Sequence, residues 1–70
     1  MMLTPIQRDI LETAANPAHQ YVTVSLTHEA TLDAVTSLLH RGYLILRDGT
    51  ALQANYFITM KGRQALKEGT

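Results

Sequence analysis

The stretch LLHRGYLILRDGT, residues 38–50, decides how this chain folds. It opens on a leucine pair and two basic residues and reaches Gly42, a residue type that commonly follows the last turn of a helix. An apolar strand, YLILR over residues 43–47, comes next, and the segment DGTALQAN over residues 48–55 then turns the chain. A second strand, YFITM over residues 56–60, completes a β-hairpin that the chain enters directly from a helix.

The helix that leads into this hairpin is predicted over residues 28–41. Thr27 is its predicted N-cap, because a threonine hydroxyl can accept a hydrogen bond from a backbone N–H of the first turn. The basic residues of the last turn suit the negative end of the helix. Five residues at helical spacing make its predicted apolar face: Ala30, Leu32, Val35, Leu38 and Leu39.

A first helix is predicted within LTPIQRDILETAANP, residues 3–17. Thr4 is the predicted N-cap, Pro5 suits the first helical position, and Gln7 can complete a capping box. The helix is expected to stop before Pro17, because the residue before a proline avoids the α region. Its predicted apolar face contains Ile6, Ile10, Leu11 and Ala14.

Two shorter elements complete the prediction. Alternation and β-branched content predict a strand over Tyr21–Ser25. The residues that point to one side of this strand are Val22, Val24 and Leu26. Thr59 is predicted to cap a last helix over residues 60–69, in which Gly62 costs about 1 kcal/mol relative to Ala. The residues of that helix expected to turn inward are Ala65 and Leu66.

The predicted order is therefore α, β, α, β, β, α. This order indicates a single α+β domain over residues 1–70, in which helices cover a small antiparallel sheet. The early strand is expected to pair beside the hairpin as a third strand. A chain of this length buries only about 60% of its unfolded surface, so stability is expected to be modest.

Composition narrows the function. The formal net charge is zero, yet residues 1–40 have a net charge of −3 and residues 41–70 a net charge of +3. The chain has no cysteine, no secretory signal and no apolar run of membrane-spanning length, so we expect a cytoplasmic protein. The three histidines lack metal-ligand spacing, and no motif of a nucleophile or phosphate loop occurs. We therefore expect no metal, no cofactor and no enzymatic activity.

The residues around the hairpin resemble a known superfamily. The leucine pair, basic residue and glycine are Leu38, Leu39, Arg41 and Gly42. The ending of the second strand is Ile58, Thr59, Gly62 and Arg63. With these residues the chain resembles winged helix-turn-helix proteins, most of all small regulators of the multiple-antibiotic-resistance and phenolic-acid-repressor kind. The opening LTPIQRDILETAA also resembles small uncharacterised proteobacterial proteins with this ending. The resemblance implies a winged-helix fold and a bacterial or phage DNA-binding transcription regulator.

One departure from that superfamily keeps a second function open. A helix-turn-helix needs two helices before the wing, but the segment VSLTHEA, residues 24–30, leaves room for only a turn or two. The predicted recognition helix also carries Glu29 and Asp33 in its first half, where carboxylates repel phosphate. A protein-interaction module built on the same fold, including a homodimer through the first helix or an edge strand, is therefore the alternative to DNA binding.

Each function has its own candidate residues. The candidates for double-stranded DNA are Thr31, Thr36, Ser37 and Arg41 in the groove, with Arg47, Lys61 and Arg63 on phosphates. The candidates for a protein interface are Tyr21, Leu46, Leu52 and Tyr56, because exposed tyrosines beside apolar residues are typical of such interfaces. Tyr43 and Phe57 are expected to be buried or half-buried in the core.

Overall fold

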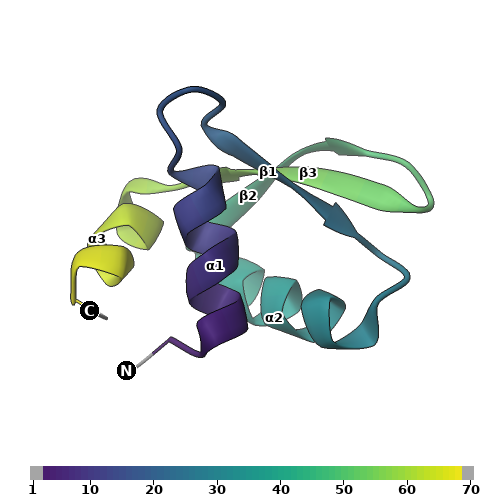
Figure 1. Ribbon diagram of the computed structural model, residues 1–70, viewed down its shortest axis with the longest axis horizontal. Helices are drawn as coiled ribbons and strands as arrows, with labels where there is room; N and C mark the ends of the chain where they lie inside the picture. Colours follow the sequence, from purple (N-terminus) through teal and green to yellow (C-terminus); the bar gives the residue numbers. More distant parts are fainter. Residues whose placement is uncertain (1–2, 69–70) are drawn as a thin grey trace.

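The computed structural model describes residues 3–68 and has the predicted α+β order (Figure 1). Its elements are α1 (Pro5–Ala14), β1 (Tyr21–Ser25), α2 (Glu29–His40), β2 (Leu44–Gly49), β3 (Gln53–Ile58) and α3 (Met60–Glu68). The strands form one antiparallel sheet in the order β1-β3-β2, so the early strand lies beside the hairpin as predicted, and its partner is the second strand of the hairpin. The predicted end of the last helix at Gly69 lies outside the described residues.

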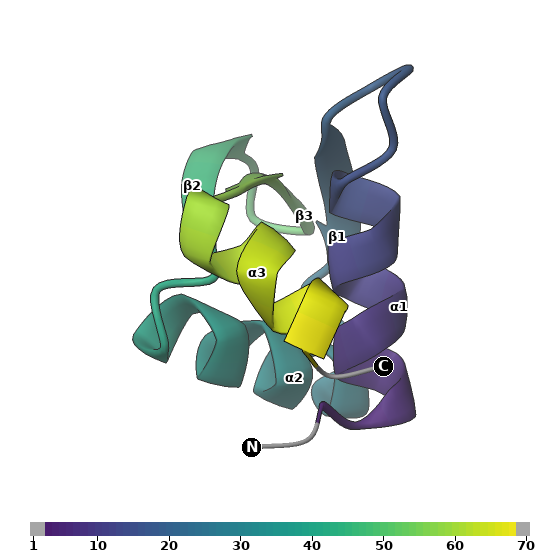
Figure 2. The same cartoon turned by 90° about the vertical axis from the view of Figure 1, so that its left-hand side faces the viewer.

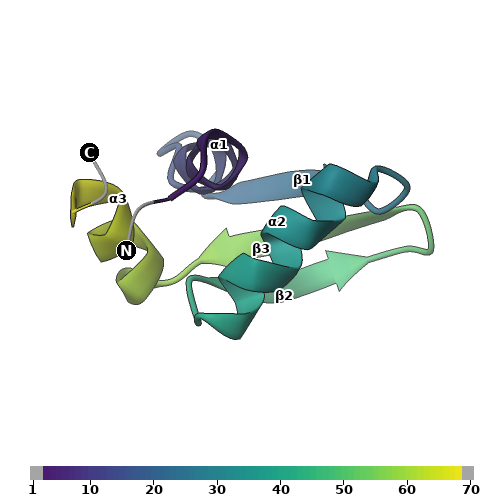
Figure 3. The ribbon, with the colours of Figure 1, turned by 90° about the horizontal axis from the view of Figure 1, so that it is seen from below.

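The helices lie on one side of the sheet (Figures 1 and 3). Helix α2 crosses beneath the strands, and α3 lies beside α1 at one end of the sheet (Figure 2). The four largest fully buried side chains come from three elements of this packing: Leu11, Val35, Leu38 and Leu44. Among the described elements, none covers the opposite face of the sheet.

Helix α1 begins as predicted. The Gln7 N–H donates to Thr4 Oγ1 at 3.2 Å, and the Thr4 N–H donates to Gln7 Oε1 at 3.1 Å, which is a complete capping box. The buried residues of α1 are Gln7, Ile10, Leu11 and Ala14. Ile6 is exposed, so its predicted place on the buried face is wrong: the stripe that meets the sheet is shifted toward Gln7.

Helix α2 begins one residue later than predicted and has a different cap. The Thr31 N–H lies 3.4 Å from Nδ1 of His28, whereas the Thr27 hydroxyl hydrogen-bonds with the Ser25 hydroxyl at 2.9 Å. The buried stripe is also narrower than predicted, since the small sheet reaches only one line of side chains. It contains Ala34, Val35 and Leu38, while Ala30, Leu32 and Leu39 lie at its exposed margins.

The end of α2 confirms the expected role of Gly42. Gly42 has φ +78°, its N–H donates to the Leu39 carbonyl at 3.0 Å, and the Tyr43 N–H donates to the Leu38 carbonyl at 2.9 Å. These two bonds are a Schellman motif, which requires a left-handed residue at the position of Gly42. The Thr59 hydroxyl donates to the Gly42 carbonyl at 2.7 Å and accepts from the Gly62 N–H at 3.0 Å, so it fastens α3 to this turn.

The connection between the two strands of the hairpin is shorter than predicted. The strands continue to Gly49 and resume at Gln53, so residues 50–52 alone join them. Asp48 pairs with Asn55 inside the ladder rather than in the turn. A β-bulge lies between Leu46 and Asp48 and leaves Arg47 as an extra residue in β2.

Gly62 has a packing role that its helix propensity does not indicate. It is buried where α3 meets the start of β2, and a Cβ added there would collide with the carbonyl oxygen of Tyr43 and crowd Ile58. Only a glycine allows this close approach, although it makes the helix less stable by about 1 kcal/mol than an alanine would. The side chains of Ala65 and Leu66 are half-buried, and Leu66 packs against the core.

Candidate interaction surface

The face of the sheet opposite the helices carries a cluster of aromatic, aliphatic and cationic side chains. Phe57 pairs with Tyr21 on β1 and with Ile45 on β2, so these three side chains are neighbours on one face. The Arg47 Cζ lies 4.8 Å from the centroid of the Tyr21 ring and 5.7 Å from that of Phe57. We call this cluster the aromatic patch. Ile45 and Phe57 remain 53% and 37% exposed in it.

The β-bulge explains how Arg47 reaches the patch. An extra residue at a bulge redirects the side chains that follow it, and here both Asp48 and Arg47 come to the open face. Arg47 also lies 4.0 Å from Asp48, but both side chains are well exposed, so this ion pair adds little stability. The predicted wing arginine therefore lies over two aromatic rings and beside a carboxylate.

A polar row bounds the patch on the side of the hairpin tip. The Thr23 hydroxyl donates to Asn55 Oδ1, and Asn55 Nδ2 donates to Asp48 Oδ1 at 2.6 Å. The three residues come from the three strands and pair across the sheet. The open face thus divides into an apolar and cationic half at the base of the hairpin and a hydrogen-bonded polar half toward its tip.

The α2 candidates for DNA contact do not form one open surface. Thr31 is half-buried, and its hydroxyl lies 2.9 Å from His28 Nδ1. The Thr36 hydroxyl donates to the Leu32 carbonyl at 2.8 Å, while Ser37 and Arg41 are half-buried. The exposed side of the first half of α2 includes the carboxylates of Glu29 and Asp33.

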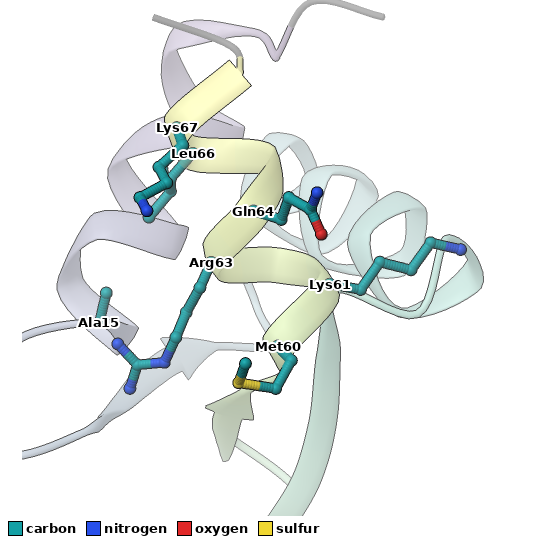
Figure 4. A pocket seen from close by; sticks show the side chains of 7 residues that line it. All are labelled: Ala15, Met60, Lys61, Arg63, Gln64, Leu66 and Lys67. Atoms are coloured by element: carbon teal, nitrogen blue, oxygen red, sulfur yellow. The ribbon is translucent and has the colours of Figure 1, made fainter.

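The cations of α3 do not share one surface. In Figure 4, Arg63 reaches toward Ala15 at the end of α1 and Lys67 points to the same side, whereas Lys61 points to the opposite side. Arg47 lies on the open face of the sheet, on the side away from α2. The seven predicted DNA contacts are therefore spread over α2, α3 and the open face, and the structure does not bring them together.

The protein-interface candidates have two different outcomes. Tyr21 belongs to the aromatic patch, whereas Leu46 and Leu52 are 62% and 64% exposed on β2 and at the hairpin tip but lie outside the patch. Tyr56 is only 5% exposed, so its place in the interface is wrong. Tyr56 pairs with Val22 on the helix-covered face, and the alternation of β3 therefore puts Phe57 on the open face.

Ile45 and Phe57 are the members of the patch that sequence reasoning missed. YLILR is apolar almost throughout, so it has no alternation that tells a buried side chain from an exposed one. The signal lay in β1, where Val22 is clearly an inward residue. Aligning β3 against β1 would have placed Tyr56 with Val22 and left Phe57 outside.

Metal-binding groups and membrane-spanning helices are both absent from residues 3–68. No group of three or more His, Cys, Asp or Glu side chains in this range is placed to hold a metal ion. His19 makes an edge contact with the Tyr21 ring at 6.1 Å between centroids. Within the same range no helix has the length and apolarity needed to cross a membrane.

Comparison with protein-family profiles, with curated proteins and with solved structures gives no match to this chain.

Proposed function

We propose that this chain is a non-enzymatic protein-interaction module and that the aromatic patch is its contact surface. The observation that carries the proposal is the exposed cluster of Tyr21, Ile45, Arg47 and Phe57 on an uncovered sheet face. Aromatic residues and arginine are enriched at protein interfaces and dominate their binding energy. Phe57 is not one of the buried side chains of the core.

The electrostatics of the patch favour a protein partner over a nucleic acid. Arg47 is the one cation of the four patch residues, and Asp48 lies beside it. Nucleic-acid affinity depends mainly on several cations that neutralise phosphates, which a patch with one paired arginine does not provide. An arginine held over aromatic rings loses little side-chain freedom on binding, which suits a protein interface.

The test is a capture experiment with matched variants. The tagged wild-type chain, Tyr21→Ala and Phe57→Ala are incubated with a lysate of the organism that encodes them. The control is Leu52→Ala, an exposed apolar residue at the hairpin tip and outside the patch. We expect the wild type and the control to retain the same partner and the two patch variants to lose it. Equal retention by all four chains contradicts the proposal.

DNA binding is the second candidate, and one observation favours it. Lys61 lies beside Gly42 at the end of α2, and α3 carries two more exposed cations, Arg63 and Lys67, which point to the side of α1. The resemblance to winged-helix regulators supports the same function. However, residues 26–28, which are all described, contain no helix, so no helix lies between β1 and α2 to form the first half of a helix-turn-helix.

Fluorescence anisotropy of a random-sequence duplex separates the two candidates. The titration is made at about 50 and about 200 mM salt, because phosphate contacts weaken steeply over this range. The protein-interaction proposal expects no binding at either concentration. Micromolar binding that is lost at higher salt and in Lys61→Ala would favour the DNA function instead.

A further inference from the structure

Strand β2 is an edge strand with an apolar surface. The sheet order β1-β3-β2 gives it a partner on one side only, and within the described chain no element lies beyond its other side (Figure 3). Ile45 and Leu46 are 53% and 62% exposed on this edge. An exposed apolar edge strand is a ready template for pairing with another strand.

The direction of the backbone groups along β2 follows from one hydrogen bond at its start. The Thr59 N–H donates to the Tyr43 carbonyl at 3.0 Å, so the carbonyl of Tyr43 faces β3, while its N–H closes the end of α2. In an antiparallel ladder this direction alternates from residue to residue. The backbone N–H and C=O groups of Ile45 therefore point toward β3, whereas those of Leu44 and Leu46 point away from the sheet.

We infer that a second copy of this chain pairs antiparallel along this edge, with the two-fold axis at Ile45. In this register the outward groups of Leu44 bond those of the partner subunit's Leu46, and the reverse pair is made by symmetry. The two sheets become one continuous sheet. The inference goes beyond the partner-binding function and does not depend on it.

Self-complementarity is the argument for a second copy as the occupant. The axis puts two Ile45 side chains directly opposite each other on the open face, where the aromatic patches of both copies then join. Leu46 falls opposite the partner subunit's Leu44 and pairs with it through backbone groups alone, because the Leu44 side chain is buried in the core of its own copy. An unrelated strand has no reason to reproduce this pattern.

The charged residues of β2 are compatible with this register, and the bulge beside them limits the length of the paired segment. Arg47 and Asp48 lie beyond the paired segment and do not oppose a like charge. The bulge at Arg47 ends regular pairing, so the contact is confined to the residues before it. Such a short contact falls below the roughly 1,200 Å² of a standard interface, so the dimer is expected to be weak and dependent on concentration.

A cysteine at the axis tests the inference directly, because the chain has no cysteine of its own. Residues opposite each other in a non-hydrogen-bonded pair have Cα atoms about 4.5 Å apart, within the range of a disulfide. We expect Ile45→Cys to form a covalent dimer on mild oxidation of the folded protein. Leu52→Cys is the control, since its exposure is similar and it lies at the hairpin tip. Equal cross-linking of the two variants overturns the inference.

Sedimentation of the unmodified chain and of Ile45→Lys gives an independent readout. Two lysines opposed at the axis repel each other, and an exposed position tolerates the side chain, so the variant is expected to stay folded and monomeric. We expect the wild type and Tyr21→Ala to dimerise as concentration rises. A wild type that stays monomeric up to millimolar concentration, or a dimer that Ile45→Lys leaves intact, contradicts the inference. Loss of a partner by Tyr21→Ala with its dimer retained separates this contact from the proposed function.

Discussion

The two faces of the sheet come from the same strands but obey different requirements. Val22 and Tyr56 pair on the helix-covered face and are buried, whereas the neighbouring pair, Tyr21 and Phe57, lies on the open face. The first pair belongs to the core, because it forms part of the apolar face on which the helices pack. The second pair lies outside this core. An aromatic pair under an arginine on an uncovered face is the feature on which the proposed contact function rests.

The largest expected loss of stability comes from a substitution on the helix-covered face of the sheet. Leu38 is fully buried between α2 and the sheet, so Leu38→Ala is expected to lower the free energy of unfolding by roughly 2–5 kcal/mol. A loss of this size is most of the stability of a domain this small. Urea denaturation followed by circular dichroism measures it. A loss below about 1 kcal/mol would mean that the covered face does not hold the fold together.

The next effect concerns the close approach of α3 to β2. Gly62→Ala improves helix propensity but drives a Cβ into the carbonyl of Tyr43, so we expect a net loss of about 1–3 kcal/mol. Gln64→Ala is the matched control on the exposed side of α3 and is expected to be neutral or slightly stabilising. If both variants are equally stable in thermal melts, α3 does not pack as described.

A smaller effect is expected at the hydroxyl that joins α2 to α3. Thr59→Val keeps the shape of the side chain and removes the bonds to the Gly42 carbonyl and the Gly62 N–H. We expect a loss of about 1–2 kcal/mol, measured by urea denaturation. Thr36→Val, which removes an exposed hydroxyl bonded within its own helix, is expected to cost much less. Equal losses of stability in the two variants would show that the Thr59 hydroxyl does not stabilise the junction of α2 and α3.

The smallest effect on stability is expected on the open face. Arg47→Ala removes a partly exposed cation over two rings, worth about 0.5–1 kcal/mol at such a site. Partner retention in the capture experiment is expected to fall far more than stability does. A variant that loses more than about 2 kcal/mol while it keeps its partner would show that the patch serves the fold.

Local sequence signals predicted the elements well because each depends on a few neighbouring residues. The capping box of Thr4 and Gln7 and the left-handed Gly42 are examples, since their geometry is set within one turn of helix. The predicted cap of α2 was wrong because Thr27 and His28 are both able to cap, and the sequence does not show that the Thr27 hydroxyl bonds Ser25 instead. The turn of the hairpin was predicted to be too long because local residue types do not show that Asp48 and Gly49 pair with β3.

The candidate site was harder to predict because it depends on register between strands. Tyr56 and Phe57 are adjacent aromatic residues, and the sequence alone does not tell which of them points inward. The pairing of Tyr56 with Val22 decides this, and that pairing joins residues far apart in the chain. The bulge at Arg47 is similarly invisible in the sequence, yet it brings the arginine onto the open face.

Photo-cross-linking from the open face tests the central claim most directly. A photoreactive phenylalanine analogue replaces Phe57 in one chain and Leu52 in a second, and both chains are irradiated in the cells that encode them. The account expects a specific adduct with another protein from position 57, and none from position 52 at the hairpin tip, although Leu52 is the more exposed of the two. The absence of any adduct from position 57, or the same adducts from both positions, would contradict the claim that the open face is where this protein binds its partner.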